Sequence, residues 1–189
     1  MPRTFPEIIA SGLNTLDQAR YFAAMGVDWL GFDLQKITVE DLKAINEWVV
    51  GPKLFVEIEN MTEDMLFELT QKIPVDGIHV SADMALPGWY AGRQILAVHD
   101  AKGLVTASHV PQSTLYISHS DLYSLSKALQ PLTNEHSIWV EYELNNIELA
   151  HRDAQKWYGI AVKCRIRPDD DSPFDPYDNF FETIRELSE

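Results

Sequence analysis

Cysteine and long apolar runs are nearly absent from this sequence. Cys164 is the one cysteine among 189 residues, so no disulfide can form within the chain and a reducing compartment fits. No apolar stretch approaches the roughly 18 residues that a membrane-spanning helix needs. The first residues hold no apolar segment of the kind that a secretory signal requires. We therefore expect a cytoplasmic protein that has no membrane partner.

Positive charge is also scarce. The chain carries 15 lysines and arginines against 29 acids, which gives a net charge of −14 and a pI near 4.7. Proteins that bind nucleic acid or anionic membranes need a basic face, so neither partner is expected. The short motifs of nucleotide-binding loops, serine hydrolases and zinc proteases are absent as well. These absences leave a small-molecule ligand, with no cofactor, as the expected partner.

What the sequence does contain is an alternation of short apolar runs with stretches of helical spacing. The runs predict strands at residues 7–12, 28–34, 53–59, 75–81, 94–99, 115–118, 137–143 and 159–166. Alternation of this kind is typical of parallel sheets, and eight strands close a (β/α)8 barrel, or TIM barrel. We predict one α/β domain over residues 1–189. An open doubly wound sheet is the competing fold.

Two connections of the predicted barrel, which we call the thin connections, lack the pattern of a full helix. Residues 83–94 contain Pro87, Gly88 and Gly92, which leave no room for a full helix. Residues 101–113 also lack helical spacing, and residues 104–107 could form a short strand instead. We therefore expect the helices after the fourth and fifth strands to be reduced or missing.

Missing helices would leave the outer faces of those two strands bare. Their helix-facing residues are Ile78, Val80, Leu96 and Val98. A contiguous apolar patch of this kind is unusual on a monomer, and a symmetric partner would cover it. This predicts a homodimer through residues 84–113, with Trp89 or Tyr90 in the interface. The alternative is that the two loops cover the strands by themselves.

The inward half of the barrel strands is unusually polar. Side chains alternate along a strand, so the apolar half identifies the residues that face the helices. The inward residues expected near the carboxyl ends include Asp33, Glu57, Glu59, His79, Ser81, His99, Tyr116, Ser118, Glu141, Glu143, Lys163 and Arg165. TIM barrels carry their active sites at this end, which favours a ligand pocket. The alternative is an internal layer of salt bridges that pairs Lys163 and Arg165 with Glu141, Glu143 or Glu57.

A metal ion is a further option for the same end of the barrel. Asp33, Glu57, Glu59 and His79 offer the oxygen and nitrogen ligands that cations prefer. No short-spaced ligand motif supports such a site, so we expect no metal. His99 precedes a turn, and a histidine in that setting is more often a surface or capping residue than a catalyst.

The opening unit has distinctive segments: Ile-Ile-Ala-Ser-Gly at residues 8–12, Leu-Asp-Gln-Ala at 16–19, Met-Gly-Val-Asp at 25–28 and Leu-Gly-Phe at 30–32. Further segments at residues 56–60, 75–80 and 175–181 continue the pattern. Together they resemble the phosphoribosylanthranilate isomerase family of tryptophan biosynthesis. The resemblance implies a TIM barrel that isomerises an aminoaldose to an aminoketose.

The resemblance also implies where catalytic groups should lie. The family uses a cysteine base on strand one and an aspartate acid on strand six, and the matching positions here are Ser11 and Ser118. Serine does not titrate near neutrality unaided, so we expect no ordinary isomerase turnover. The family also binds phosphate at glycine-rich turns after strands seven and eight. Here those turns, residues 143–146 and 165–170, contain acids and no glycine.

Three functions follow from these features. The first is a diverged isomerase-like barrel that binds a small anionic metabolite at its carboxyl-terminal mouth and isomerises it with its own carboxylates. The second is a non-catalytic binding or regulatory barrel, and the third is a genuine phosphoribosylanthranilate isomerase. The candidate catalytic residues are Asp33, Glu57, Glu143, Ser11 and Ser118. The candidate substrate-binding residues are His79, Ser81, Lys163 and Arg165.

Overall fold

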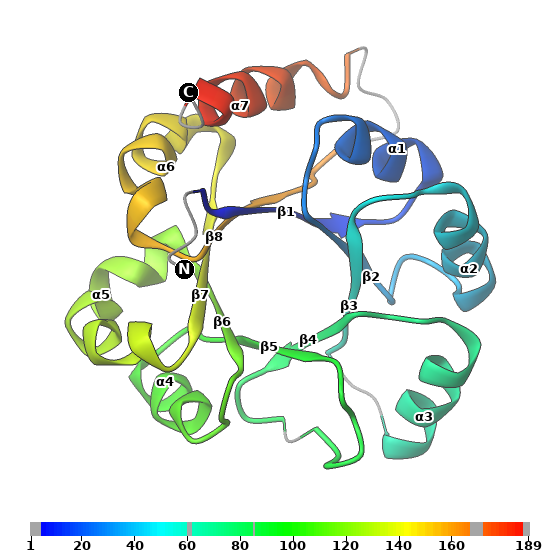
Figure 1. The fold of residues 1–189 in the computed structure, drawn as a ribbon, viewed down its shortest axis with the longest axis horizontal. Helices are drawn as coiled ribbons and strands as arrows, with labels where there is room; N and C mark the ends of the chain where they lie inside the picture. Colours follow the sequence, from blue (N-terminus) through cyan, green and yellow to red (C-terminus); the bar gives the residue numbers. More distant parts are fainter. Residues whose placement is uncertain (1–4, 60–61, 85, 167–171, 187–189) are drawn as a thin grey trace.

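The computed structural model describes all residues except 1–4, 60–61, 85, 167–171 and 187–189. Eight parallel strands close into a barrel in sequence order, and β8 pairs with β1. Helices surround the barrel on its outside (Figure 1). The predicted TIM-barrel fold is therefore confirmed, and the open-sheet alternative is wrong.

The elements follow one another in a regular order. The strands are β1 (Glu7–Leu13), β2 (Trp29–Asp33), β3 (Lys53–Glu57), β4 (Gly77–Ser81), β5 (Arg93–Ala97), β6 (Thr114–Ser118), β7 (Ser137–Tyr142) and β8 (Gly159–Lys163). The α-helices are α1 (Leu16–Ala24), α2 (Val39–Trp48), α3 (Glu63–Lys72), α4 (Ala101–Ser108), α5 (His119–Leu129), α6 (Ile147–Asp153) and α7 (Asp175–Arg185). Short 3-10 turns at Gln130–Asn134, Leu144–Asn146 and Ala154–Lys156 adjoin α5 and α6. None of the helices in the described ranges is both long and apolar enough to cross a membrane.

Side-chain caps fix where five of these helices begin. Thr15, Thr38, Thr62, Asp100 and Ser118 each accept a hydrogen bond from a backbone N–H three residues later. Such a cap satisfies one of the donors that the first helical turn leaves unpaired. The local sequence therefore places the helix starts directly after the carboxyl ends of the strands.

The two thin connections differ from each other. No helix lies between β4 and β5 in the described residues, as predicted. After β5, however, residues 101–108 form the eight-residue helix α4, where the sequence indicated no helix and allowed a strand at 104–107. Asp100 caps it through the Gly103 N–H at 2.7 Å, and Leu104 and Ala107 bury its inner face. The cap and this three-residue spacing outweigh the low helix propensity of Gly103.

The bare apolar patch expected on β4 and β5 is absent. Its four residues, Ile78, Val80, Leu96 and Val98, are buried within the single chain. Tyr90 of the β4–β5 connection is buried with them, Leu104 of α4 packs in the same core, and Met84 and Leu86 lie against it. The chain therefore covers these strands by itself, and the apolar patch from which the sequence predicts a homodimer is not exposed.

The middle of the barrel is a packed layer of large side chains. Ile9, Trp29, Phe55, Ile95, Tyr116, Trp139 and Ala161 form one buried cluster inside the sheet. Glycines make room for the aromatic rings, because a Cβ on Gly31 would lie 2.1 Å from the Phe55 ring. This layer separates the two ends of the barrel, as is usual for the fold.

The amino-terminal end of the barrel, which we call the base of the barrel, is closed by an ion pair. The Arg93 guanidinium lies 2.9 Å from the Glu7 carboxylate, which also accepts a hydrogen bond from Trp139 Nε1 at 3.0 Å. The guanidinium carbon stands 4.8 Å from the Trp29 ring centroid and 5.5 Å from that of Trp139. Cation–π contact and ion pairing together stabilise this charge inside the barrel. An opening of the barrel to ligands is therefore found at the other end.

Candidate functional site

The carboxyl ends of strands β3 to β8 surround a cavity of about 430 Å3, which we call the mouth cavity. Its wall consists of Glu57, Ile58, Glu59, His79, Val80, Ser81, Ala97, His99, Tyr116, Ser118, Glu141 and Lys163. Five residues predicted as site residues are thereby brought together: Glu57, His79, Ser81, Ser118 and Lys163. The other four, Ser11, Asp33, Glu143 and Arg165, do not line it.

A β-bulge in β1 positions the first carboxylate. The β1–β2 register shifts between Ala10 and Leu13, and Gly12 adopts a φ of +72°. The freed Gly12 N–H donates to Glu57 Oε1 at 2.6 Å. A Cβ at Gly12 would lie 3.3 Å from Cγ of Lys163, so the glycine also makes room for the lysine stem. The bulge therefore orients Glu57 and Lys163 at once.

Glu57 has an altered acidity. Burial raises the pKa of its carboxyl group, while the Gly12 hydrogen bond and the Lys163 charge oppose the rise. The negative charges of Asp33 and Glu141 add to it. A carboxyl group with a raised pKa holds its proton closer to neutrality, which is the property of a general acid.

Tyr116 connects β1, β6 and β7 at the floor of the cavity. Its hydroxyl donates to Glu141 Oε2 at 2.6 Å and lies 3.1 Å from Ser11 Oγ. Burial, followed by the charges of Glu141 and Glu57, raises the pKa of Tyr116 well above its usual value. The phenol therefore keeps its proton and fixes the orientation of Glu141.

Lys163 differs from Arg93 and Arg165, which both form ion pairs. In the part of the chain that the structure describes, no carboxylate oxygen lies within 4 Å of the Lys163 Nζ and the lysine side chain makes no hydrogen bond. It lines the mouth cavity and also a second cavity of about 240 Å3, together with Tyr142, Glu143, Leu144, Asn145 and Arg165. We call the second one the rim cavity. A cation at the boundary of two cavities is placed to meet a ligand.

His79 lines the mouth cavity as a neutral ring. Burial, together with the charges of Lys163 and His99, lowers the pKa of His79 to about 3. Its Nε2 is buried and has no hydrogen-bond partner among the described residues, and its ring centroid is 4.7 Å from that of Tyr116. An imidazole with so low a pKa does not donate a proton as a general acid near neutrality.

Three predicted site residues lie in ion pairs at the rim. Asp33 contacts Lys36 Nζ at 2.6 Å, and Glu143 contacts Arg165 Nη2 at 2.6 Å. Burial alone would raise the pKa of Asp33, but the hydrogen bonds from Lys36 and the Gln35 N–H lower it overall. The salt-bridge alternative thus holds for Arg165 and Glu143 but not for Lys163. The turn at residues 165–170 lies partly outside the described residues.

The two serine positions have structural partners. Ser11 is buried against Tyr116, and Ser118 caps α5 while donating to Asp121 Oδ2 at 2.8 Å. The same Asp121 oxygen lies 3.5 Å from Nδ1 of His99, whose side chain is 73% exposed. His99 is therefore a surface residue, as expected, although it also borders the mouth cavity.

Sequence reasoning left Glu141 and Tyr116 out of the candidate site. Both residues stand at positions where the strand alternation points the side chain into the barrel, and this pattern could have identified them. Their role depends on the hydrogen bond between β6 and β7, which the sequence alone does not show. The metal option has no support among the described residues, because no group of three or more His, Cys, Asp or Glu side chains could hold an ion.

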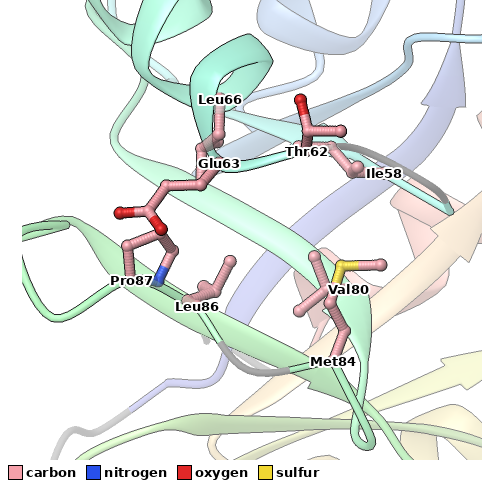
Figure 2. Close-up of a pocket in the computed structure, with 8 residues that line it drawn as sticks. All are labelled: Ile58, Thr62, Glu63, Leu66, Val80, Met84, Leu86 and Pro87. Atoms are coloured by element: carbon pink, nitrogen blue, oxygen red, sulfur yellow. The ribbon is translucent and has the colours of Figure 1, made fainter.

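A separate apolar pocket of about 260 Å3 lies outside the barrel wall, between α3 and the β4–β5 connection. Figure 2 shows its lining side chains, among them Leu66 of α3 and Met84 and Leu86 of the connection. Glu63, at its edge, accepts a hydrogen bond from Trp89 Nε1 at 2.8 Å. Apart from Thr62 and Glu63, the residues that line this pocket are apolar.

No family model and no curated protein matches the sequence. Solved structures do resemble it. The phosphoribosylanthranilate isomerase of Thermotoga maritima, a dimeric enzyme, has a TM-score of 0.74 at 10% identity over 97% of this chain and 98% of that one. The Pyrococcus furiosus isomerase has a TM-score of 0.73 at 15% identity over 96% and 99%.

A barrel of different chemistry is also similar. A truncated 3-deoxy-D-arabino-heptulosonate 7-phosphate synthase of Thermotoga maritima has a TM-score of 0.64 at 15% identity, over 98% of this chain and 86% of that one. Identities at this level show a shared fold. The chain thus has the TIM-barrel architecture of the phosphoribosylanthranilate isomerases, which confirms the resemblance in fold that its sequence predicts.

Proposed function

We propose that the chain is a diverged relative of the phosphoribosylanthranilate isomerases that binds a small anionic metabolite in the mouth cavity and isomerises it with its own carboxylates. One observation carries the proposal. Lys163 has no ion-pair partner among the described residues and faces a cavity that also contains Glu57 and Glu141. A cation that has no ion-pair partner can bind an anionic group of a ligand. Two carboxyl groups beside the same cavity can transfer protons to and from that ligand.

The roles of the residues follow from their environments. Lys163 holds the anionic group, and Arg165 lines the same rim cavity. Glu57, whose pKa is raised, supplies a proton to an oxygen of the ligand. Glu141, oriented by Tyr116, accepts a proton from the neighbouring carbon. Removal of the carbon proton by Glu141 and protonation of the carbonyl oxygen by Glu57 give an enediol. Glu57 then takes the proton of the other enediol hydroxyl group and Glu141 returns its proton to the adjacent carbon, which completes the isomerisation and restores both groups; such acid–base groups contribute about 10²–10⁴-fold to rate.

The alternative of a non-catalytic binding barrel predicts a plugged mouth with every acid paired. Asp33 and Glu143 are paired, which fits that alternative. The open cavity and the raised pKa of Glu57 favour an enzyme. The genuine isomerase alternative is disfavoured, because Ser11 and Ser118 are engaged in structural hydrogen bonds.

Deuterium incorporation separates these alternatives. A panel of aldose and ketose phosphates is incubated with the protein in D2O, and binding and exchange at the carbon next to the carbonyl are followed by NMR. We expect one member to bind and exchange, and Glu57→Gln and Glu141→Gln to bind it without exchange. Binding without exchange by the native protein would establish the non-catalytic barrel. No binding of any member would contradict the proposal.

We also propose a cytoplasmic homodimer with contacts in residues 84–113. Trp89 supports it, since its side chain is 42% exposed and its ring packs edge-on against exposed Phe67, with centroids 5.6 Å apart. The dimeric state of the Thermotoga maritima isomerase is consistent with it. Sedimentation equilibrium at micromolar concentration is the test, and a single species of 21.5 kDa would refute the dimer.

A further inference from the structure

We propose that the mouth cavity selects ligands that carry an aliphatic ammonium group as well as an acidic group, so that the ligand is a small zwitterion or amino-substituted acid. This inference rests on the proposed function, because it names the ligand class of the same site. It follows from the balance of hydrogen-bond donors and acceptors around the cavity.

The carboxylates of the cavity have unused acceptor atoms. Glu57 receives a hydrogen bond at Oε1 from the Gly12 N–H, and Glu141 receives one at Oε2 from Tyr116. No donor in the described part of the chain reaches the second oxygen of either group. Ionised Glu141 can accept several hydrogen bonds, so its Oε1 is left for a donor of the ligand. The second oxygen of Glu57 carries the proton that this group supplies as the acid.

The hydroxyl groups of the cavity have no proton to offer a ligand. Tyr116 gives its proton to Glu141, so Ser11 must be the donor in its contact with Tyr116. Ser118 gives its proton to Asp121. Ser81 hydrogen-bonds to Asp83. Lys163 is thus the charged donor that faces the cavity, beside the neutral ring of His79, and a single ammonium group fits one acidic group of a ligand.

The charges around the cavity also favour a ligand that carries an ammonium group. Glu59 and Glu141 line it together with one lysine, while Glu57 carries a proton when it acts as the acid and His79 is held neutral. A ligand that is only an anion would satisfy Lys163 but would also meet these carboxylates. An ammonium group on the ligand compensates their charge, and a hydroxyl group does not. A charge-assisted hydrogen bond of this kind changes affinity by about 10- to 100-fold.

The test compares 3-aminopropyl phosphate with propyl phosphate, which differ only in the amine. Their dissociation constants are measured by ¹H–¹⁵N NMR titration of the full chain. We expect the amino compound to bind about 10- to 100-fold more tightly. Glu141→Gln should remove most of that preference while propyl phosphate binds as before or better, and the second variant, Glu57→Gln, should reduce the preference less because it replaces a protonated carboxyl group. Glu63→Gln, on the apolar pocket outside the barrel, is the matched control and should keep the preference.

The outcomes separate this inference from the proposed function. Equal affinity for the two compounds, with both weakened in Lys163→Met, would overturn the amine selectivity and leave the anion site intact. Absence of binding by either compound at about 10 mM would overturn both. A preference that persists in both acid variants, shown by circular dichroism to be folded, would also overturn the inference.

Discussion

The two ends of this barrel use buried charge in opposite ways. At the base, Glu7 and Arg93 form a 2.9 Å ion pair that Trp29 and Trp139 flank. At the mouth, Glu57 and Lys163 lie near each other without an ion pair, beside a cavity of about 430 Å3. Paired and enclosed charges serve stability, whereas separated charges beside a cavity remain available to a ligand. The base of the barrel thus stabilises the fold, whereas the mouth has charged groups that can interact with a ligand.

Breaking the base pair should have the largest effect on stability. Arg93→Met removes the guanidinium that lies 2.9 Å from the buried Glu7 carboxylate, and we expect a loss of about 3 kcal/mol in the free energy of unfolding. Lys163→Met removes a cation that has no ion pair among the described residues, so it should cost less than about 1 kcal/mol. Urea unfolding measures both variants. Equal losses would contradict the distinction between the two ends.

The Gly12 bulge links backbone geometry to the mouth. Gly12→Ala forces a residue with a Cβ to adopt φ +72°, which costs about 1–2 kcal/mol, and pushes it against Lys163. Gly26→Ala is the matched control, because Gly26 has φ +77° and no atom within 4 Å of the added Cβ. We expect similar destabilisation in both. Weaker binding of ribose 5-phosphate, by several-fold, should appear in Gly12→Ala alone.

The pH dependence of stability should reveal Glu57. Its pKa in the folded state is raised above the ordinary value of 4.5, so its stabilising contribution is complete below pH 4.5 and is lost as the pH rises through the folded-state pKa. Glu57→Gln removes this loss. The unfolding free energy of the native protein should therefore fall relative to that of the variant as the pH rises from 4.5. A constant difference, measured by urea titrations at several pH values, would contradict a raised pKa; Glu59→Gln, an exposed carboxylate, is the control.

Restoring the family's catalytic pair should have the smallest effect. Ser11→Cys and Ser118→Asp together place a thiol and a carboxyl group where the isomerases have theirs. We expect no growth when this double variant, or the native chain, is expressed in a tryptophan auxotroph that lacks the isomerase. Glu141, Tyr116 and the rim ion pair still occupy the surroundings of the site. Robust growth with the native chain would favour the genuine isomerase.

The fold was largely predictable because its signals are local. Strand parity placed Glu57, His79 and Lys163 inward, and apolar spacing identified six of the helices. The helix α4 was not predicted, because Gly103 interrupts its helical spacing of apolar residues and because Asp100, which caps it, was interpreted as part of a turn. Contacts across the barrel were beyond reach, since Arg93 and Glu7 are 86 positions apart and no local pattern connects them.

The candidate site was predictable in its position but not in its pairing. The strand alternation predicts that Asp33 and Glu143 point into the barrel, as it does for Glu57 and Glu141. Asp33 and Glu143 nevertheless form ion pairs at the rim. The difference arises from how far along each strand a residue lies and from which cation is nearby. Neither the Gly12 bulge nor the hydrogen bond of Tyr116 to Glu141 has a signature in the sequence.

The central claim is that Lys163 at the mouth is kept for an anionic ligand. Calorimetric titration of ribose 5-phosphate into the native protein and into Lys163→Met, at low ionic strength, tests it directly. We expect the variant to bind at least about tenfold more weakly, because a charge-assisted contact is lost. Equal affinity in the two proteins would show that the anion binds elsewhere and would contradict the account.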